Sequence, residues 1–361
     1  MRPTPLPRFA AVVPIGNSDP RLKSSLRSLQ IQNVDMDVAL MDASNDGSVH
    51  HIADSFSSLL TFRKHATDAG QASAIMEGWK QIQGDILFWL NADDVLLPGT
   101  IATVAEVFCS SPEIDIVYGH SIILDSHAQL TGYHMAVEEI SDLILRSNTI
   151  SQPSCFVRRR AINEIGGINP DLEFVMDWDL WVRLYRAGKI FHFIDKPLSA
   201  VVFEKGTKTA SIKLRRLSEA FALSRRYSGT WAALKTVIGI ALHHLGAYTV
   251  MASLGSQMRS IRHRKTQKFI FGIGRDGQID GEAQIPLPNL ADEAKQRISI
   301  HLDTRNSDDV SVTAGNNTGK NVGDDNTLVT LERAIDPGEV QWLSFKSPTG
   351  QQTRFSYACW R

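Results

Sequence analysis

The sequence lacks the features that mark several specialised protein classes. Its 361 residues include only 3 cysteines, which stand far apart without CxxC spacing, so neither a disulfide scaffold nor a cysteine zinc site is expected. The formal net charge of −1 argues against a surface built throughout for nucleic acid. The first residues, Met1 to Arg8, lack the apolar run of a signal peptide. These absences predict a cytoplasmic protein that binds no nucleic acid.

Long hydrophobic runs are also scarce. The stretch from Thr236 to Met258 carries no charged residue, but histidines and glycines interrupt it, so we expect no transmembrane helix. Its surroundings are basic, with 13 Lys and Arg against 2 Asp and Glu between Glu204 and Lys268. Such a segment can lie on a membrane surface, pack on the rest of the protein or mediate self-association. Peripheral contact with the inner face of a membrane through residues 225–268 is therefore one expectation.

The histidines show no metal-binding spacing. His50 and His51 are adjacent, and His120, His127 and His134 follow without an HExxH motif or a comparable pair. We therefore expect them to have structural or surface roles.

Short apolar runs alternate with helical patterns over the first 200 residues. The predicted buried strands are Phe9–Val13, Val38–Met41, Ile86–Leu90 and Ile114–Tyr118. Apolar residues at helical spacing predict helices around 22–29, 75–82 and 101–108. This order predicts an α/β fold with a mainly parallel sheet, which binds ligands beyond the carboxyl ends of its strands. Polar clusters follow the first three strands, so we expect a site there.

Two adjacent carboxylates follow the third predicted strand, in Asn91-Ala92-Asp93-Asp94. Carboxylates in contact repel each other unless a positive group offsets them. Mg²⁺ or Mn²⁺ prefers such oxygen ligands and commonly accompanies a phosphate. The structural alternative is that one of these residues caps the next helix or lies in a solvated turn.

A second acidic segment, Asp177-Trp178-Asp179, opens a predicted helix that ends at Gly188. It predicts either helix caps or a general base.

Several segments, taken in order, resemble inverting family 2 glycosyltransferases of the GT-A fold. The resemblance covers roughly residues 8–215 and rests on the segments Val12–Asn17, Asp42–Ser48, Asp68–Gln71 with Ala74, Trp89–Asp94, Ser151–Ser154, Gly166–Gly167, Met176–Trp181 and Gly206–Thr209. Trp89–Asp94 is similar to one branch's form of the DxD metal motif. The resemblance implies a GT-A catalytic domain over residues 1–212, with a Rossmann-like sheet that binds a nucleotide-diphospho-sugar.

The resemblance also implies a role for each matching residue. The donor-binding residues would be Pro14, Asn17, Asp42, Asp68, Gln71, Asn91, Asp93 and Lys208. Asp93 and Asp94 would hold the Mn²⁺ or Mg²⁺ that bridges the diphosphate. Asp177 would take the proton of the acceptor hydroxyl, with Asp179 as the alternative base. Gln152, Trp178 and Asp179 would lie on the acceptor side.

Three positions depart from the family pattern. Asn91 replaces the first Asp of the DxD motif, Met176 replaces a common Glu, and Glu204 stands where relatives carry a basic residue.

The last hundred residues predict a different kind of fold. Apolar side chains recur with a period of two at 269, 271 and 273, at 298, 300 and 302, at 310 and 312, and at 355, 357 and 359. Turn sequences stand at 275–277, 316–319 and 336–338. We expect a basic amphipathic helical segment at 213–267, followed by an all-β, sandwich-like domain at 268–361.

Together these features predict a metal-dependent hexosyltransferase of polysaccharide biosynthesis. It would move a sugar from a nucleotide-sugar donor to a glycan, lipid-linked or protein acceptor, with inversion of the anomeric configuration. We expect the donor to be a UDP-sugar. A nucleotidyltransferase is a weaker alternative, because the Pro14–Pro20 stretch lacks a glycine-rich loop with a basic residue. A catalytically degenerate glycan-binding protein is the third hypothesis, which Asn91 and the β domain favour.

Overall fold

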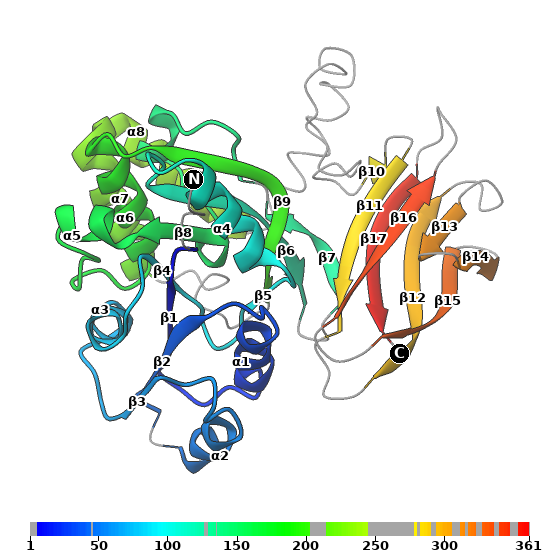
Figure 1. Ribbon diagram of the computed structural model, residues 1–361. Coiled ribbons are helices and arrows are strands. Elements are labelled where there is room, and N and C mark those ends of the chain that lie inside the picture. Colours follow the sequence, from blue (N-terminus) through cyan, green and yellow to red (C-terminus); the bar gives the residue numbers. More distant parts are fainter. Residues whose placement is uncertain are drawn as a thin grey trace. The chain divides into compact units, whose positions relative to one another are not determined.

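The computed structural model describes residues 6–44, 46–125, 129–134, 136–202, 214–244, 278–279, 282–289, 294–304, 311–314, 317–322, 327–335, 339–346 and 353–360 (Figure 1). The chain divides into two compact units. The first comprises Met1–Ser121, Met135–Val201 and Lys205–Gly246, and the second comprises Ile122–His134, Val202–Glu204 and Ala247–Arg361. The domain boundaries predicted at residues 212 and 267 stay predictions.

The first unit is built on a mixed, mainly parallel sheet, which confirms the predicted α/β fold. Strands β3 (Phe62–His65), β2 (Met36–Asp42), β1 (Phe9–Ile15) and β4 (Ile86–Trp89) lie side by side and run parallel. Beyond β4 follow β8 (Cys155–Arg158), β6 (Ile116–Leu124), β9 (Phe191–Val202) and β5 (Val95–Leu96), with β8 antiparallel to both β4 and β6. Strand β3 was not predicted.

Helices cover both faces of this sheet (Figure 1). They are α1 (Leu22–Gln30), α2 (Gly47–Ser55), α3 (Gln71–Gln81), α4 (Thr100–Ser110), α5 (Arg159–Glu164), α6 (Met176–Arg186), α7 (Leu214–Ser228) and α8 (Thr230–His244), with short 3-10 helices η1 (Asp142–Leu145) and η2 (Gln152–Ser154). Helix α6 ends as predicted, with Gly188 at a φ of 70° and the amide of Lys189 bonded to Leu184 O. None of the described helices combines the length and the apolar character needed to cross a membrane.

The strands divide their side chains between two hydrophobic cores because successive residues point to opposite faces. Val12 of β1 and Trp89 of β4 join the core formed with α3, α6 and α7. Val13 of β1 and Phe88 of β4 join the core formed with α1, α2 and α4. Helix α3 packs closely on the sheet at Gly78, where an added Cβ would stand 2.8 Å from a Val12 methyl. A hydrophobic core therefore packs against each face of the sheet up to the ends of its strands.

The second unit is an all-β region, as predicted. One antiparallel sheet pairs β10 (Gln278–Ile279) with β17 (Thr353–Trp360), β17 with β12 (Lys295–Thr304), β12 with β15 (Thr327–Ile335), and β15 with β14 (Asn317–Val322). Another pairs β11 (Glu282–Pro288) with β16 (Val340–Lys346) and β16 with β13 (Ser311–Ala314). Strand β7 (Leu130–His134) also pairs with β17.

The two sheets of this region share an apolar interior. Ile298, Ile300 and Leu302 alternate on β12 and are buried, as their period of two predicts. The rings of Phe345 on β16 and Phe355 on β17 meet edge to face, 5.9 Å apart between centroids. Sheets joined through such contacts form a sandwich-like core.

One predicted turn of the second unit differs in position. Strand β14 already begins at Asn317, which pairs with Ala314, so most of the 316–319 turn sequence lies in a strand. The turns at 275–277 and 336–338, and the alternation at 269–273, lie outside the described residues.

Candidate active site

Several predicted site residues lie where the parallel strands end. The register of β1 and β2 sets Ile15 opposite Asp42, and that of β1 and β4 sets Val12 opposite Trp89. The segments after β1, β2 and β4 therefore leave the sheet at the same edge. Pro14 is buried inside β1, whereas Asn17 is exposed just beyond it.

Asp42, the last residue of β2, is 4% exposed and fully engaged. Its Oδ1 accepts hydrogen bonds from the backbone N and the Oγ of Ser44, at 2.8 and 2.6 Å. Its Oδ2 lies 2.7 Å from Nδ1 of His65, the last residue of β3. The buried carboxylate is thus held in one orientation by two neighbours. Further along the loop, Asp46 caps helix α2 by accepting from the amide of Ser48.

Asp68 and Gln71 lie at the start of α3. Asp68 is exposed and accepts from the amide of Gly70 at 2.8 Å, which shapes the loop before the helix. Gly70 has a φ of 108°, a conformation that favours glycine. Gln71, the first residue of α3, donates through Nε2 to Oδ1 of Asn91 at 2.8 Å. The α3 loop and the end of β4 are therefore joined through their side chains.

Asn91 is the centre of a polar network after β4. Besides accepting from Gln71, it donates through Nδ2 to Asp94 Oδ2 at 2.9 Å and to Gln152 Oε1 at 3.3 Å. Gln152 in turn donates to the carbonyl of Trp89 at 2.7 Å. Because the acidic partner of Asn91 accepts hydrogen bonds when ionised, the amide nitrogen faces Asp94. The structure thus gives Asn91 a positioning role toward Asp94.

The acidic pair places two carboxylates next to each other in the chain. Asp94 is buried, and burial, followed by the neighbouring charge of Asp93, raises the pKa of Asp94 well above its ordinary value, against the smaller opposing effects of the Asn91 hydrogen bond and the charge of Arg21. Neither residue caps the next helix, because α4 begins after Gly99 without a side-chain cap. A cation between the two carboxylates would relieve this repulsion. The donor set of two hard oxygens fits Mg²⁺ or Mn²⁺.

The two acids of α6 differ in their surroundings. Asp179 is 3% exposed and accepts from Arg183 Nε at 2.7 Å, one helical turn away. Asp177 is half-buried and accepts from Asn148 Nδ2 at 2.9 Å. Burial raises the pKa of Asp177, and the charge of Arg216 opposes that rise only weakly. Asp179 is therefore held by a cationic partner, whereas Asp177 is held by a neutral amide, and which of them is the predicted base stays a prediction.

Trp178 lies between these acids but faces the core. Its side chain is 3% exposed, and its Nε1 donates to the carbonyl of Ile144. The structure gives it a packing role, and the predicted sugar contact stays a prediction. Lys208 and Glu204 lie outside the described residues.

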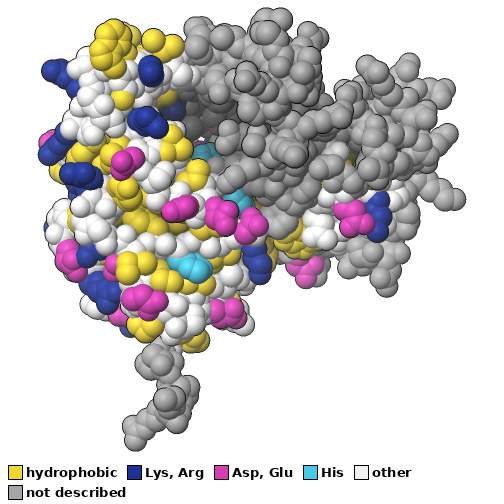
Figure 2. All heavy atoms as spheres, turned by 90° about the horizontal axis from the view of Figure 1, so that it is seen from above, with side chains coloured by type: hydrophobic (Ala, Val, Ile, Leu, Met, Phe, Trp, Pro, Cys, Tyr) yellow, Lys and Arg dark blue, Asp and Glu magenta, His cyan; other side chains and the backbone are white. Residues whose placement is uncertain are grey.

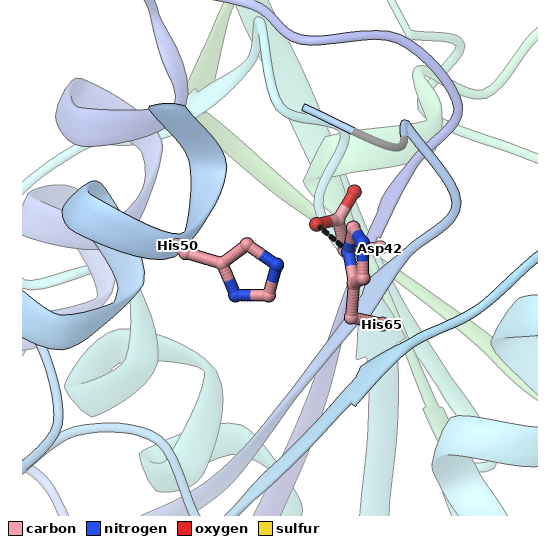
Figure 3. Close-up of side chains that lie close together, drawn as sticks. All are labelled: Asp42, His50 and His65. Carbon is pink, nitrogen blue, oxygen red and sulfur yellow. Dashed lines mark hydrogen bonds and ion pairs between the residues drawn. The ribbon is translucent and has the colours of Figure 1, made fainter. Parts of the chain in front are cut away.

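The histidine cluster around Asp42 was missed from the sequence. His50 on α2 and His65 on β3 have ring centroids 4.2 Å apart, and both stand beside Asp42 (Figure 3). Residue spacing does not signal this cluster because the three residues come from three elements. The signal that exists is the parallel register of β2 and β3, which sets Asp42 opposite His65.

Comparison with known proteins finds similarity in the first part of the chain. Residues 10–166 match the family model described as glycosyl transferase family 2. An uncharacterized glycosyltransferase of Rickettsia conorii is 25% identical over 213 residues, 55% of this chain and 35% of that protein. The O-antigen biosynthesis protein RfbC of Myxococcus xanthus is 29% identical over 133 residues, 37% of this chain and 10% of that protein. The chain thus spans about a third or less of the length of these relatives.

Solved structures with a related arrangement are more distant. Residues 1–349 of S. aureus TarS in complex with UDP-GlcNAc are 14% identical, with a TM-score of 0.46 and coverage of 72% of this chain and 77% of that chain. The mannosyltransferase PcManGT of Pyrobaculum calidifontis, in complex with GDP-Man and Mn²⁺, is 18% identical, with a TM-score of 0.46 and coverage of 72% and 82%. At TM-scores this low, no feature of the ligand sites in those two structures is assigned to this chain.

Proposed function

Since residues 10–166 match the glycosyl transferase family 2 model, we propose that the chain transfers a sugar from a nucleotide-sugar donor to an acceptor hydroxyl. The observation that carries the proposal is the pair Asp93 and Asp94, which lies in the turn after β4 at the same sheet edge as Asp42. Ligands of parallel sheets bind at this edge. The expected GT-A fold agrees with the mixed, mainly parallel sheet of the first unit.

We propose that Asp93 and Asp94 hold a divalent cation, Mn²⁺ or Mg²⁺. The raised pKa of Asp94, caused mainly by burial and then by the charge of Asp93, supports this, because a bound cation would stabilise the ionised form that these surroundings disfavour. When bound, the cation would supply positive charge to the departing diphosphate. Asn91 would keep Asp94 oriented, since its Nδ2 donates to that carboxylate.

The remaining donor contacts are proposed around Asp42. Its carboxylate is preorganised by Ser44 and can accept from an imide N–H, as a uracil ring presents, so a UDP-sugar is the proposed donor. Pro14 and Asn17 at the end of β1 would line the same pocket, together with Asp68 and Gln71 from the α3 loop. Lys208 stays in the proposal as a counter-charge for the diphosphate.

Asp177 is the proposed general base. It would take the proton of the acceptor hydroxyl while that oxygen bonds to the anomeric carbon and the bond from this carbon to the diphosphate oxygen breaks. One such displacement inverts the configuration. Asp179 is the weaker candidate because Arg183 already occupies its carboxylate. Gln152 remains the proposed acceptor-side contact, next to the acidic pair through Asn91.

Calorimetric titration of UDP, GDP and dTDP, with Mn²⁺ and with EDTA, tests the donor half of the proposal. We expect one nucleotide to bind in a metal-dependent manner, and the corresponding nucleotide sugar to be hydrolysed or transferred. Absence of binding by all three nucleotides would contradict the assignment. Binding without turnover, in the presence of candidate glycan acceptors, would favour a degenerate glycan-binding protein.

The acceptor is proposed to be a glycan or lipid-linked sugar of polysaccharide biosynthesis. The name of one relative, an O-antigen biosynthesis protein, supports this class. Incorporation of radiolabelled sugar into a lipid-extractable product would separate a lipid-linked acceptor from a free glycan.

Peripheral membrane contact is proposed through helix α8. Trp231, Leu234 and Ile238 recur at helical spacing and are exposed, with Trp231 at 80%. In Figure 2, basic, acidic and apolar side chains lie interspersed on the described surface. An exposed apolar stripe with basic neighbours is typical of helices that lie on anionic membranes.

Vesicle co-sedimentation tests this contact. Trp231→Ala should reduce binding to vesicles that contain phosphatidylglycerol, whereas Trp342→Ala, which changes an exposed tryptophan of the second unit, should not. Equal binding of both variants would remove α8 from the membrane proposal.

A further inference from the structure

Three side chains that can ligate a metal meet outside the acidic pair. Asp42 ends β2, His65 ends β3, and His50 projects from α2 toward them (Figure 3). One ligand atom from each side chain lies within 4.8 Å of the other two. The closest pair is His65 Nδ1 and Asp42 Oδ2, at 2.7 Å.

We propose that Asp42, His50 and His65 form a binding site for a transition-metal ion such as Zn²⁺ or Co²⁺. Two imidazoles and one carboxylate are ligands that Zn²⁺ prefers, whereas Mg²⁺ and Mn²⁺ favour oxygen ligands. The chemistry of this cluster therefore differs from that of Asp93 and Asp94, and the two sites would select different ions.

The ligand atoms of the three side chains are close enough together to bind one ion after small movements. A tetrahedral Zn²⁺ with bonds of about 2.1 Å holds its ligand atoms about 3.4 Å apart. The pair at 2.7 Å would open slightly, and the widest separation, up to 4.8 Å, would close. Rotation of the half-buried His50 side chain can supply most of that movement, since it extends from a helix surface.

The surroundings hold the ligands in place. Ser44 occupies Oδ1 of Asp42 with two hydrogen bonds and leaves Oδ2 directed at His65. Such neighbours orient ligands and raise metal affinity. The parallel register of β2 and β3 fixes Asp42 opposite His65. The His65 side chain is 35% exposed, which gives an ion access from solvent and room for a water as the fourth ligand.

Binding would replace the hydrogen bond between His65 and Asp42. An imidazole nitrogen that ligates a metal carries no proton, so a neutral His65 would bind the ion through Nδ1 as the tautomer that keeps its proton on Nε2. Binding of that tautomer releases no net proton, and no electron moves.

Asp42 is also a proposed donor-binding residue, so the ion would compete with the nucleotide. This consequence rests on the proposed function, whereas the metal site itself does not.

Zn²⁺ titration of the full chain, freed of metal by EDTA and dialysis, tests the site. We expect one ion to bind per chain, and Co²⁺ to produce a visible absorption band that Zn²⁺ abolishes. His50→Gln and His65→Gln should each weaken Zn²⁺ binding at least tenfold. His51→Gln is the matched control, because His51 is the exposed neighbour of His50 on the same helix, and it should retain full affinity.

Several results would overturn the site. They are the absence of saturable Zn²⁺ binding, unchanged affinity in His50→Gln and His65→Gln, and equal loss in His51→Gln. Circular dichroism of each variant separates lost ligands from lost folding.

Measuring nucleotide binding alongside Zn²⁺ binding distinguishes this inference from the proposed function. Zn²⁺ binding in a chain that binds no nucleotide would leave the metal site standing and contradict the donor assignment. Nucleotide binding in a chain that binds no Zn²⁺ would contradict the metal site and leave the donor assignment standing. If both bind, weaker nucleotide binding at saturating Zn²⁺ supports a shared Asp42, and unchanged binding contradicts the competition.

Discussion

The two acids of helix α6 allow a sharp test of which one is the base. Asp177→Asn and Asp179→Asn make the same chemical change two residues apart. Their surroundings predict opposite effects on activity and stability, because Asp179 is paired with Arg183, whereas Asp177 accepts a hydrogen bond from the neutral side chain of Asn148.

Asp177→Asn should abolish transfer without weakening the fold. Loss of a general base costs about 10²–10⁴-fold in rate. Burial raises the pKa of Asp177, which means that the folded state disfavours its charge. A neutral amide of the same size removes that cost, and its oxygen can still accept from Asn148. The melting temperature should therefore stay equal to the wild-type value or rise slightly.

Asp179→Asn should act mainly on stability. It breaks a largely buried ion pair, in which Asp179 and Arg183 side chains are 4% and 22% exposed. Loss of one partner of a fully buried ion pair costs about 3–5 kcal/mol. We expect a smaller loss of about 2–3 kcal/mol here, because the arginine is partly solvated. For a unit of this size, we expect the melting temperature to fall by about 5–10 °C.

Differential scanning fluorimetry and a donor-saturated transfer assay measure both effects. UDP binding by calorimetry serves as the control and should be unchanged in Asp177→Asn. Near wild-type turnover in Asp177→Asn would refute the assignment. A stable but inactive Asp179→Asn would move the base to Asp179.

Three further predictions concern the acidic pair and the backbone. Asp93→Ala should weaken nucleotide binding at least tenfold with Mn²⁺ but not with EDTA, and the exposed Asp35→Ala should change neither; equal binding in both buffers would remove Asp93 from the metal site. The raised pKa of Asp94 means that its contribution to stability is present below pH 3.8 and lost as pH rises through the raised value. In metal-free buffer at pH 8, Asp94→Asn should therefore melt a few degrees higher than wild type, by about 1 kcal/mol, and the difference should shrink on acidification; a lower melting temperature at pH 8 would contradict this. Gly166→Ala and Gly167→Ala should each lose about 1 kcal/mol in urea unfolding, since φ is 79° and 80°, and Gly167→Ala should lose slightly more because its new Cβ would displace the flexible end of the Met76 side chain; a larger loss in Gly166→Ala would contradict this.

The parts of the fold with strong hydrophobic periodicity were predictable. β1, β2 and β4 are fully buried runs, which only a covered parallel sheet accommodates. β3 was not, because Phe62-Arg63-Lys64-His65 alternates half-buried and exposed positions and contains no continuous apolar run. Its place is set by pairing with β2, a tertiary contact that local sequence does not encode.

The site was predictable to the level of strand ends and motifs. The sequence indicates where Asp42 and Asp93 lie, because Asp42 ends an apolar strand and Asp93 lies in the turn after another. It does not indicate that the Asn91 side chain donates to Asp94, and the predicted contact of Asn91 with the donor stays a prediction. Nor does it separate Asp177 from Asp179, since the difference depends on Arg183 one helical turn later.

The division of each central strand between two cores has a consequence for how this domain can diversify. The last core residues, such as Met41 and Leu90, directly precede the first site residues, Asp42 and Asn91. Residues that pack in the cores and residues of the proposed site therefore occupy consecutive stretches of the chain and overlap little. A loop after a strand can be exchanged without repacking either core, so new ligand preferences can arise on an unchanged framework. The same separation makes these loops the natural targets for engineering.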